Sequence, residues 1–150
     1  MTELRVIGHR LLVLHFDELS CAVIASELAA IDHDGTHARV NVEGPLRELH
    51  EYLPGCSSSA PAMRLIIDVA GTRRAFRVRA RLELVETSLL YRMPRMLRDC
   101  GCAPWLRGIA LLEDDGDSAE VDTKRPALWL DLARLAASID GVANPKEMLR

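Results

Sequence analysis

Two neighbouring segments with alternating apolar and polar side chains limit most strongly what this chain can fold into. They cover residues 63–69 and 76–85, and Gly71 and Thr72 stand between them. A period of two is typical of β-strands with one buried face, and a short link that contains glycine joins two such strands into a hairpin. The sequence therefore predicts an antiparallel hairpin in the middle of the chain.

The apolar side chains of this hairpin also predict its register. If Val69 pairs with Arg74, the apolar residues of the two strands lie opposite one another on one face. The pairs that follow are Ile67 with Phe76, Leu65 with Val78, and Met63 with Ala80. A shift by one residue would turn these side chains to the other face, so we expect the core to set the register.

A second hairpin is expected near the start of the chain, from residues 11–16 and 19–24. Because apolar side chains occupy both parities of these strands, we expect both faces of the hairpin to be buried. Residues 27–31 stay open between a helix, which their alanine and leucine favour, and a strand. Residues 37–42 are expected to form a further strand.

Short helices are expected at two places. Residues 44–55 begin with Gly-Pro, carry leucines on one helical face and end with Pro-Gly. Residues 56–61 contain three serines and a proline, which predicts a flexible connector. Near the C-terminus, Asp131 is expected to cap a helix that Gly141 closes.

Length and composition fit one globular domain without a membrane span. The chain has 150 residues, of which 49% are apolar, and this suffices for one well-buried core. The net charge is -3 with acids and bases interspersed, so no global field indicates a nucleic-acid or membrane partner. No apolar run has the length of a signal peptide or a spanning helix, and we expect a cytoplasmic protein. There the four cysteines, Cys21, Cys56, Cys100 and Cys102, are expected to be thiols.

The order of the segments after the central hairpin carries a resemblance. A turn with Pro94 comes first, then a strand entered through Trp105-Leu106-Arg107-Gly108, then a strand over residues 127–135 that contains Leu-Asp-Leu. In this order they resemble the second half of the CheW-like coupling domain, the adaptor that ties bacterial chemoreceptors to their histidine kinase. The resemblance covers roughly residues 10–140.

The resemblance implies an all-β fold of two small five-stranded, SH3-like barrels packed together, with short helices after Gly44 and near the C-terminus. The single domain would cover residues 1–150, with one subdomain over about 10–55 that exchanges strands and another over about 62–140. It also implies a non-catalytic adaptor without a cofactor. Its expected partners are the regulatory domain of a CheA-like histidine kinase and a chemoreceptor tip, which would recruit it to membrane receptor arrays.

One turn departs from the family pattern. CheW-like domains carry Asn-Leu-Arg-Gly, where this chain has Asn41-Val42-Glu43-Gly44, and the proline that follows comes about three residues early. The family's arginine, implicated in contacting the receptor, corresponds to Glu43, which reverses the charge. The resemblance implies a receptor-type groove at this place. The fold around it would be kept, whereas the surface that meets the partner would have changed. Its residues would be Asn41, Glu43, Gly44, Leu84 and Val85.

Arginines crowd the second strand of the central hairpin, where alternation places Arg77, Arg79 and Arg81 on one face. A kinase-type or basic face would consist of Met63, Arg64, Arg77, Arg79 and Arg81. The same stripe allows an alternative function, a β-barrel that binds nucleic acid. Base stacking needs aromatic side chains between the cations, and the nearest, Phe76, lies on the opposite face. A solvated face or a contact for an acidic protein patch is therefore favoured.

A metal or redox protein is the remaining alternative. Cys100 and Cys102 could bind a soft metal together with Cys56 or a histidine. Tetrahedral zinc needs four ligands, and this spacing lacks a second pair, so ordinary thiols are favoured. Residues 113–117 are acidic and are expected to form a solvated loop.

Overall fold

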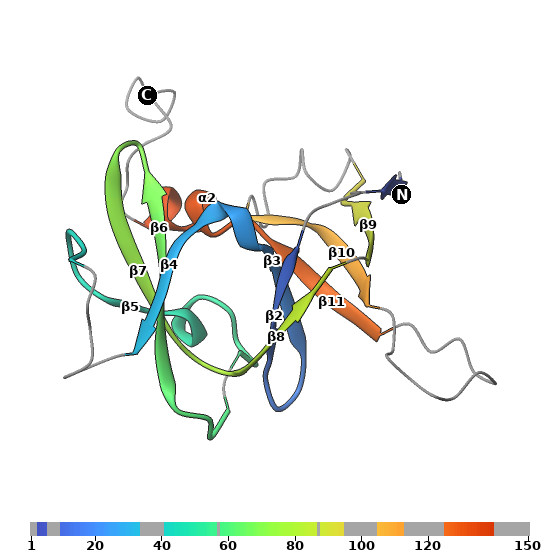
Figure 1. The fold of residues 1–150 in the computed structure, drawn as a ribbon, viewed down its shortest axis with the longest axis horizontal. Coiled ribbons are helices and arrows are strands. Elements are labelled where there is room, and N and C mark those ends of the chain that lie inside the picture. Colours follow the sequence, from blue (N-terminus) through green and yellow to red (C-terminus); the bar gives the residue numbers. More distant parts are fainter. Residues whose placement is uncertain are drawn as a thin grey trace.

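The computed structural model describes residues 3–5, 10–33, 41–56, 58–86, 88–94, 105–112 and 125–139. Figure 1 shows two β-sheets side by side, with helix α2 (Leu132–Ile139) beside them. The seven-stranded sheet has the order β1-β9-β10-β11-β3-β2-β8, and the four-stranded sheet has the order β4-β6-β7-β5. The strands are β1 (Glu3–Arg5), β2 (Leu11–His15), β3 (Ser20–Ile24), β4 (Leu28–His33), β5 (Arg47–Glu48), β6 (Ala62–Val69), β7 (Thr72–Arg79), β8 (Arg81–Val85), β9 (Ser88–Arg92), β10 (Leu106–Leu112) and β11 (Arg125–Leu130).

The predicted all-β, SH3-like class is confirmed. Two barrels of five strands each were expected, whereas in the described ranges one sheet has seven strands and the other has four. One reason is that the second strand of the central hairpin continues as β8 after a break at Ala80, and β8 pairs with β2 in the larger sheet. The seven-stranded sheet therefore combines early strands (β1 to β3) with late ones (β8 to β11), whereas the four-stranded sheet consists of β4 to β7 from between them.

The predicted register of the central hairpin is wrong by two residues. Val69 lies opposite Thr72, not Arg74, and Leu65 lies opposite Phe76. The reason is a tight two-residue turn, in which Ala70 and Gly71 have φ angles of 51° and 82°. A shift by two residues keeps every side chain on its expected face, so the apolar face forms as predicted.

The N-terminal hairpin is confirmed, and both its faces are buried. On β2, Leu12 and Leu14 belong to the larger core, whereas Leu11 and Val13 belong to a second core. The larger core also contains Phe76 and Leu135 and joins the two sheets to α2. This hairpin therefore stands between two apolar clusters.

The remaining expectations have mixed outcomes. The helix after Gly44 is a single 3-10 turn, η3 (Leu49–Glu51), because β5 directly before it is extended and pairs in parallel with β7. Of residues 27–31, which stayed open between helix and strand, Glu27 ends a 3-10 turn, η1 (Ala25–Glu27), and the other four belong to β4. Of the strand expected at residues 37–42, the first four residues lie outside the described part and the last two have no regular structure.

The C-terminal helix is confirmed as α2, and its predicted cap is present. The Oδ1 atom of Asp131 accepts a hydrogen bond from the backbone N–H of Arg134 at 3.0 Å. Gly141, expected to close the helix, lies outside the described residues. Among the residues searched, no helix has the length and apolar character needed to span a bilayer.

Candidate interaction sites

The Trp105-Leu106-Arg107-Gly108 motif forms a β-bulge at the start of β10. Leu106 lies opposite Leu130 and Gly108 opposite Trp129, so Arg107 is the extra residue between two pairs. A Cβ atom on Gly108 would lie 1.8 Å from the carbonyl oxygen of Tyr91 in β9. Glycine at this position allows β9 to approach, and the bulge places the Arg107 side chain outside the regular alternation.

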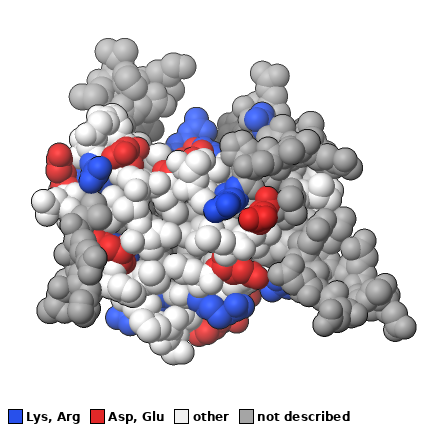
Figure 2. Space-filling view, viewed as in Figure 1, with Lys and Arg blue, Asp and Glu red and all other residues white. Residues whose placement is uncertain are grey.

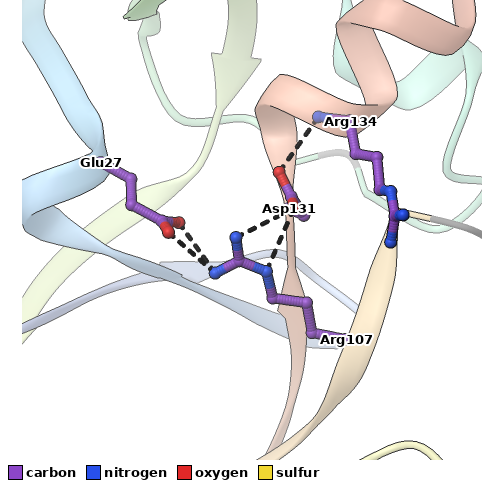
Figure 3. Close-up of polar contacts among 4 residues, drawn as sticks. All are labelled: Glu27, Arg107, Asp131 and Arg134. Atoms are coloured by element: carbon purple, nitrogen blue, oxygen red, sulfur yellow. Dashed lines mark hydrogen bonds and ion pairs between the residues drawn. The ribbon is translucent and has the colours of Figure 1, made fainter.

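Arg107 connects three separate elements of the fold (Figure 3). Its Nη1 atom donates to both carboxylate oxygens of Glu27, at 2.9 and 3.0 Å, and its Nη2 atom donates to Oδ2 of Asp131 at 2.9 Å. The guanidinium carbon also lies 5.7 Å from the centre of the Trp129 ring, within the range of a cation–π contact. Burial alone lowers the pKa of Arg107, but the hydrogen bonds and charges of Glu27 and Asp131 outweigh it and raise that pKa.

Asp131 is held in place by its own backbone as well as by Arg107. Its N–H donates to the carbonyl of Trp105 at 2.7 Å, and its carbonyl accepts from the N–H of Leu135 at 3.1 Å. One carboxylate oxygen caps α2 while the other accepts from Arg107. Asp131 therefore fixes the start of the helix relative to β10.

A cleft of about 330 Å³ lies beside this cluster. It lies where residues of β3, β4, β6 and β10 meet the start of α2, and Val23, Leu28, Ile67, Leu132 and Ala133 contribute its apolar lining. The charged lining consists of Glu27, Asp68, Asp131 and Arg107. Apolar walls with a few charged groups are typical of sites that bind a small ligand or an aliphatic side chain of a partner.

The residues predicted for the receptor-type groove fall into two separate groups. The turn at Asn41–Gly44 packs on the start of β7: the N–H of Glu43 donates to the carbonyl of Arg73 at 2.8 Å, and its carbonyl accepts from Nη1 of Arg74 at 3.0 Å. Leu84 and Val85 lie instead at the end of β8, opposite Leu12 and Leu11 of β2. The structure thus attaches one group to the four-stranded sheet and the other to the seven-stranded sheet.

Leu84 is the more conspicuous member of the second group. Its exposed fraction is 61%, high for a large apolar side chain, and β8 is an edge strand of its sheet. Exposed apolar side chains on a strand edge are typical of surfaces that bind a partner. In the sequence, Leu84 carries no feature that distinguishes it from the buried leucines.

The predicted basic face keeps its alternation, but two of its arginines are paired with carboxylates. Arg79 and Arg81 are exposed, while Val78 and Ala80, which alternate with them, are buried, as expected. Arg77, however, donates to Glu48 at 2.5 Å. The predicted face therefore does not form a uniformly basic strip.

Arg64, the other arginine of that face, is buried. Its Nε and Nη2 atoms donate to the two carboxylate oxygens of Asp32 at 2.7 and 2.5 Å. The ion pair leaves Arg64 unsuited to bind phosphates, and Figure 2 shows charges of both signs scattered among uncharged atoms on the face in view. These features argue against the nucleic-acid alternative.

A polar cluster around His15 was missed by sequence reasoning. Its Nδ1 atom lies 2.9 Å from Oγ of Ser20, and its Nε2 atom lies 2.7 Å from Oε1 of Glu83. These contacts cross from β3 through β2 to β8 and fasten the three strands. Alternation places His15 on a strand but does not reveal its neighbours, because Glu83 is 68 residues away in the chain.

The cysteines divide into a described pair and an undescribed pair. Cys21 and Cys56 are free thiols, and their sulfur atoms lie 3.7 Å apart. Cys100 and Cys102 lie outside the described residues, so the metal or redox alternative built on them stays a prediction. In the part of the chain that was searched, no group of three or more His, Cys, Asp or Glu side chains could hold a metal ion.

Comparison with known proteins supports the fold. No family model matches the chain, and no curated protein is similar to it in sequence. A solved structure, the scaffolding protein TtCheW from Thermoanaerobacter tengcongensis, has a similar fold with a TM-score of 0.53 and 13% identity. The similarity covers 87% of this chain and 88% of that one. At this identity, it shows a CheW-like fold.

Proposed function

We propose that the protein is a non-catalytic adaptor that couples a receptor or another input to a CheA-like histidine kinase. The observation that carries this proposal is the fold, which is shared with a CheW scaffolding protein over 87% of the chain. Fold alone does not determine function, so the proposal also depends on surfaces that suit protein partners. On this proposal the protein has no catalytic activity and acts in the cytoplasm at receptor arrays.

The edge of β8 supports a role in binding. Leu84 exposes 61% of its surface there, and Val85 beside it is partly buried. A partner that covered this edge would remove apolar surface from water, which supplies affinity, and would meet the charged residues Glu83 and Glu86, which select partners. We assign Leu84 and Val85 to the surface that meets a receptor or a kinase.

The turn at Asn41–Gly44 supports a second contact with altered specificity. Glu43 makes its hydrogen bonds to the start of β7 through its backbone N–H and carbonyl, and the residue is exposed to solvent. An acidic side chain there favours a basic or neutral group on the partner. We propose that the receptor differs from the usual family receptor at this point of contact.

Binding of a kinase regulatory domain tests the proposal. Calorimetry with the CheA-like regulatory domain from the same organism should detect binding by the parent protein. Leu84→Asp should weaken binding to the kinase or to the receptor tip at least about tenfold, because it places a charge in an apolar contact. Ile31→Asp is the matched control, since Ile31 is an exposed apolar residue (39%) on the other sheet and should leave binding unchanged.

Two results would contradict the proposal. Failure of the parent protein to bind any CheA-like regulatory domain or receptor tip of its own organism would reject the adaptor function. Binding that Leu84→Asp and Ile31→Asp leave equally intact would retain the adaptor function and reject the edge of β8 as the contact.

A further inference from the structure

Two buried thiols that are far apart in the sequence meet in the larger core. The sulfur atoms of Cys21 and Cys56 lie 3.7 Å apart, and the residues are 35 positions apart in the chain. Their exposed fractions are 0% and 3%. A disulfide needs a sulfur–sulfur distance of about 2.05 Å, so the two sulfur atoms would have to move closer together for a bond to form.

The two residues belong to elements of different kinds. Cys21 lies in β3, between β2 and β11, where it is opposite Leu14 and Leu128. Cys56 follows η3 at the beginning of the connector to β6, and its N–H donates to the carbonyl of Leu53 at 3.0 Å. Gly55 before it has a φ angle of 93°, a conformation that glycine adopts without strain. A bond between the sulfurs would fasten the connector to the seven-stranded sheet.

We propose that Cys21 and Cys56 form a reversible disulfide on exposure to a hydroperoxide, and that this pair is an oxidative modification site of the protein. The thiols already touch, and one of them lies in a connector rather than in the middle of a sheet. Brief opening of the short turn at Leu53–Cys56 admits a small oxidant to Cys56. Cys21, within the sheet, then serves as the resolving thiol.

The proposed chemistry is a two-electron oxidation in two steps. The thiolate of Cys56 attacks one peroxide oxygen, the O–O bond breaks, and the products are a sulfenic acid and water or an alcohol. The sulfur of Cys21 then attacks the sulfenic sulfur, the S–S bond forms, and the hydroxyl leaves as water with the Cys21 proton. The two thiols together lose two electrons and two protons, and the hydroperoxide is reduced.

The hydrogen bond between the thiols supports this order of events. It lowers the pKa of Cys56, because the Cys21 thiol donates to the Cys56 thiolate. The same hydrogen bond and burial raise the pKa of Cys21. Thiolates are the nucleophiles in such reactions, so Cys56 is the first to react.

The oxidised protein should differ measurably from the reduced protein. A cross-link closing a loop of this length restricts the unfolded chain, and we expect the melting temperature to rise by about 5–10 °C. Backbone amides of the connector after Cys56 should exchange more slowly with deuterium. Both effects should disappear when dithiothreitol reduces the bond.

The test uses the full chain and a variant in which Cys100→Ser and Cys102→Ser remove the other two thiols. Each is treated with hydrogen peroxide, and thiols are counted in denaturant before and after treatment. We expect the variant to lose both remaining thiols, and peptide mapping of both proteins to show Cys21 linked to Cys56. Adding Cys21→Ala to the variant should instead leave Cys56 as a sulfenic or sulfinic acid.

Three outcomes would overturn the proposal. One is that both thiols survive under conditions that oxidise free cysteine. Another is that peptide mapping of the full chain finds Cys21 or Cys56 joined to a different cysteine. The third is that the variant forms dimers through these residues in place of the internal bond. None of these outcomes depends on kinase binding, so the result is independent of the proposed adaptor function.

Discussion

Single residues decide how closely the strands of the larger sheet approach. Gly108 is the clearest example, because a Cβ atom there would lie 1.8 Å from the backbone oxygen of Tyr91. A backbone atom cannot move aside as the end of a flexible side chain can. The glycine of the Trp-Leu-Arg-Gly motif is therefore required by packing between β9 and β10.

We expect Gly108→Ala to lower the free energy of unfolding by about 2–4 kcal/mol, since β9 and β10 must separate to admit the methyl group. Gly71→Ala is the matched control: Gly71 has a φ angle of 82° but no atom within 4 Å of an added Cβ. It should cost only about 1 kcal/mol, from backbone strain. Urea denaturation of both variants measures the difference, and equal losses would refute the packing role of Gly108.

A further prediction concerns Phe76, which is 1% exposed in the larger core. Truncation to alanine should lower the free energy of unfolding by about 3–5 kcal/mol, because it removes a buried ring and leaves a cavity. Phe76→Leu, which keeps most of the volume, should cost less. A loss below about 1 kcal/mol for Phe76→Ala in chemical denaturation would show that the ring is not part of the core.

At the scale of secondary-structure elements, Arg107 joins β10 to η1 and to the start of α2. Its two partners differ in exposure: the side chain of Glu27 is 42% exposed and that of Asp131 is 17% exposed. Water screens the first pair more than the second. The bulge therefore fastens the helix more firmly than it fastens the 3-10 turn.

Double-mutant cycles test this difference. With Arg107→Met as the common variant, the coupling energy to Glu27→Gln should be below about 1 kcal/mol, as for exposed ion pairs. The coupling to Asp131→Asn should be larger, about 1–2 kcal/mol, because two hydrogen bonds to a less exposed carboxylate are lost. Equal coupling energies, measured from urea denaturation, would contradict the difference in screening.

The central hairpin shows how far the sequence predicts an element. Alternation correctly assigned Leu65 and Phe76 to the buried face, but a slip by two residues preserves alternation and is invisible to it. The observed register depends on Ala70, which adopts a left-handed conformation that is unfavourable for alanine. The sequence indicated a longer link because the register was chosen by pairing apolar side chains, and that criterion does not fix the length of the turn.

This turn yields a stabilising substitution. Ala70→Asn should raise the free energy of unfolding by about 0.5–1 kcal/mol, because Asn-Gly is the preferred pair for a two-residue turn with both φ angles positive. If Val69 paired with Arg74 and the link were longer, the same substitution would have no such effect. Thermal and chemical denaturation measure the gain, and a destabilised variant would argue against the two-residue turn.

At the scale of the whole molecule, the fold was more predictable than the sites. The order of apolar segments and the Trp-Leu-Arg-Gly motif carried the resemblance to the CheW-like domain, and that resemblance implied the all-β, SH3-like class. The cluster around Arg107 was not predictable, because its partner Glu27 is 80 residues away. The partner-binding role of Asn41, Glu43, Gly44, Leu84 and Val85 stays a prediction, as does that of the basic face.

Partner choice is expected to follow the charge at Glu43. Glu43→Arg should weaken binding to the native receptor tip by about 1–3 kcal/mol, because it reverses the charge that the proposed receptor meets. Folding and kinase binding should be nearly unchanged, since Glu43 makes its hydrogen bonds to β7 through its backbone N–H and carbonyl. Calorimetry with the receptor tip and with the kinase domain separates the two effects. Unchanged receptor affinity would exclude this turn from the contact.

The parallel pairing of β3 with β11 has a consequence for how the protein is made. Cys21 and Ala22 pair with Leu128 and Trp129, so β3 meets a strand that is translated much later. Until the ribosome releases that late strand, the N-terminal hairpin has an unpaired edge and two apolar faces without a complete core. The seven-stranded sheet therefore cannot be completed until β11 has been synthesised. During this interval the exposed strand edge and apolar faces make the nascent chain prone to aggregation.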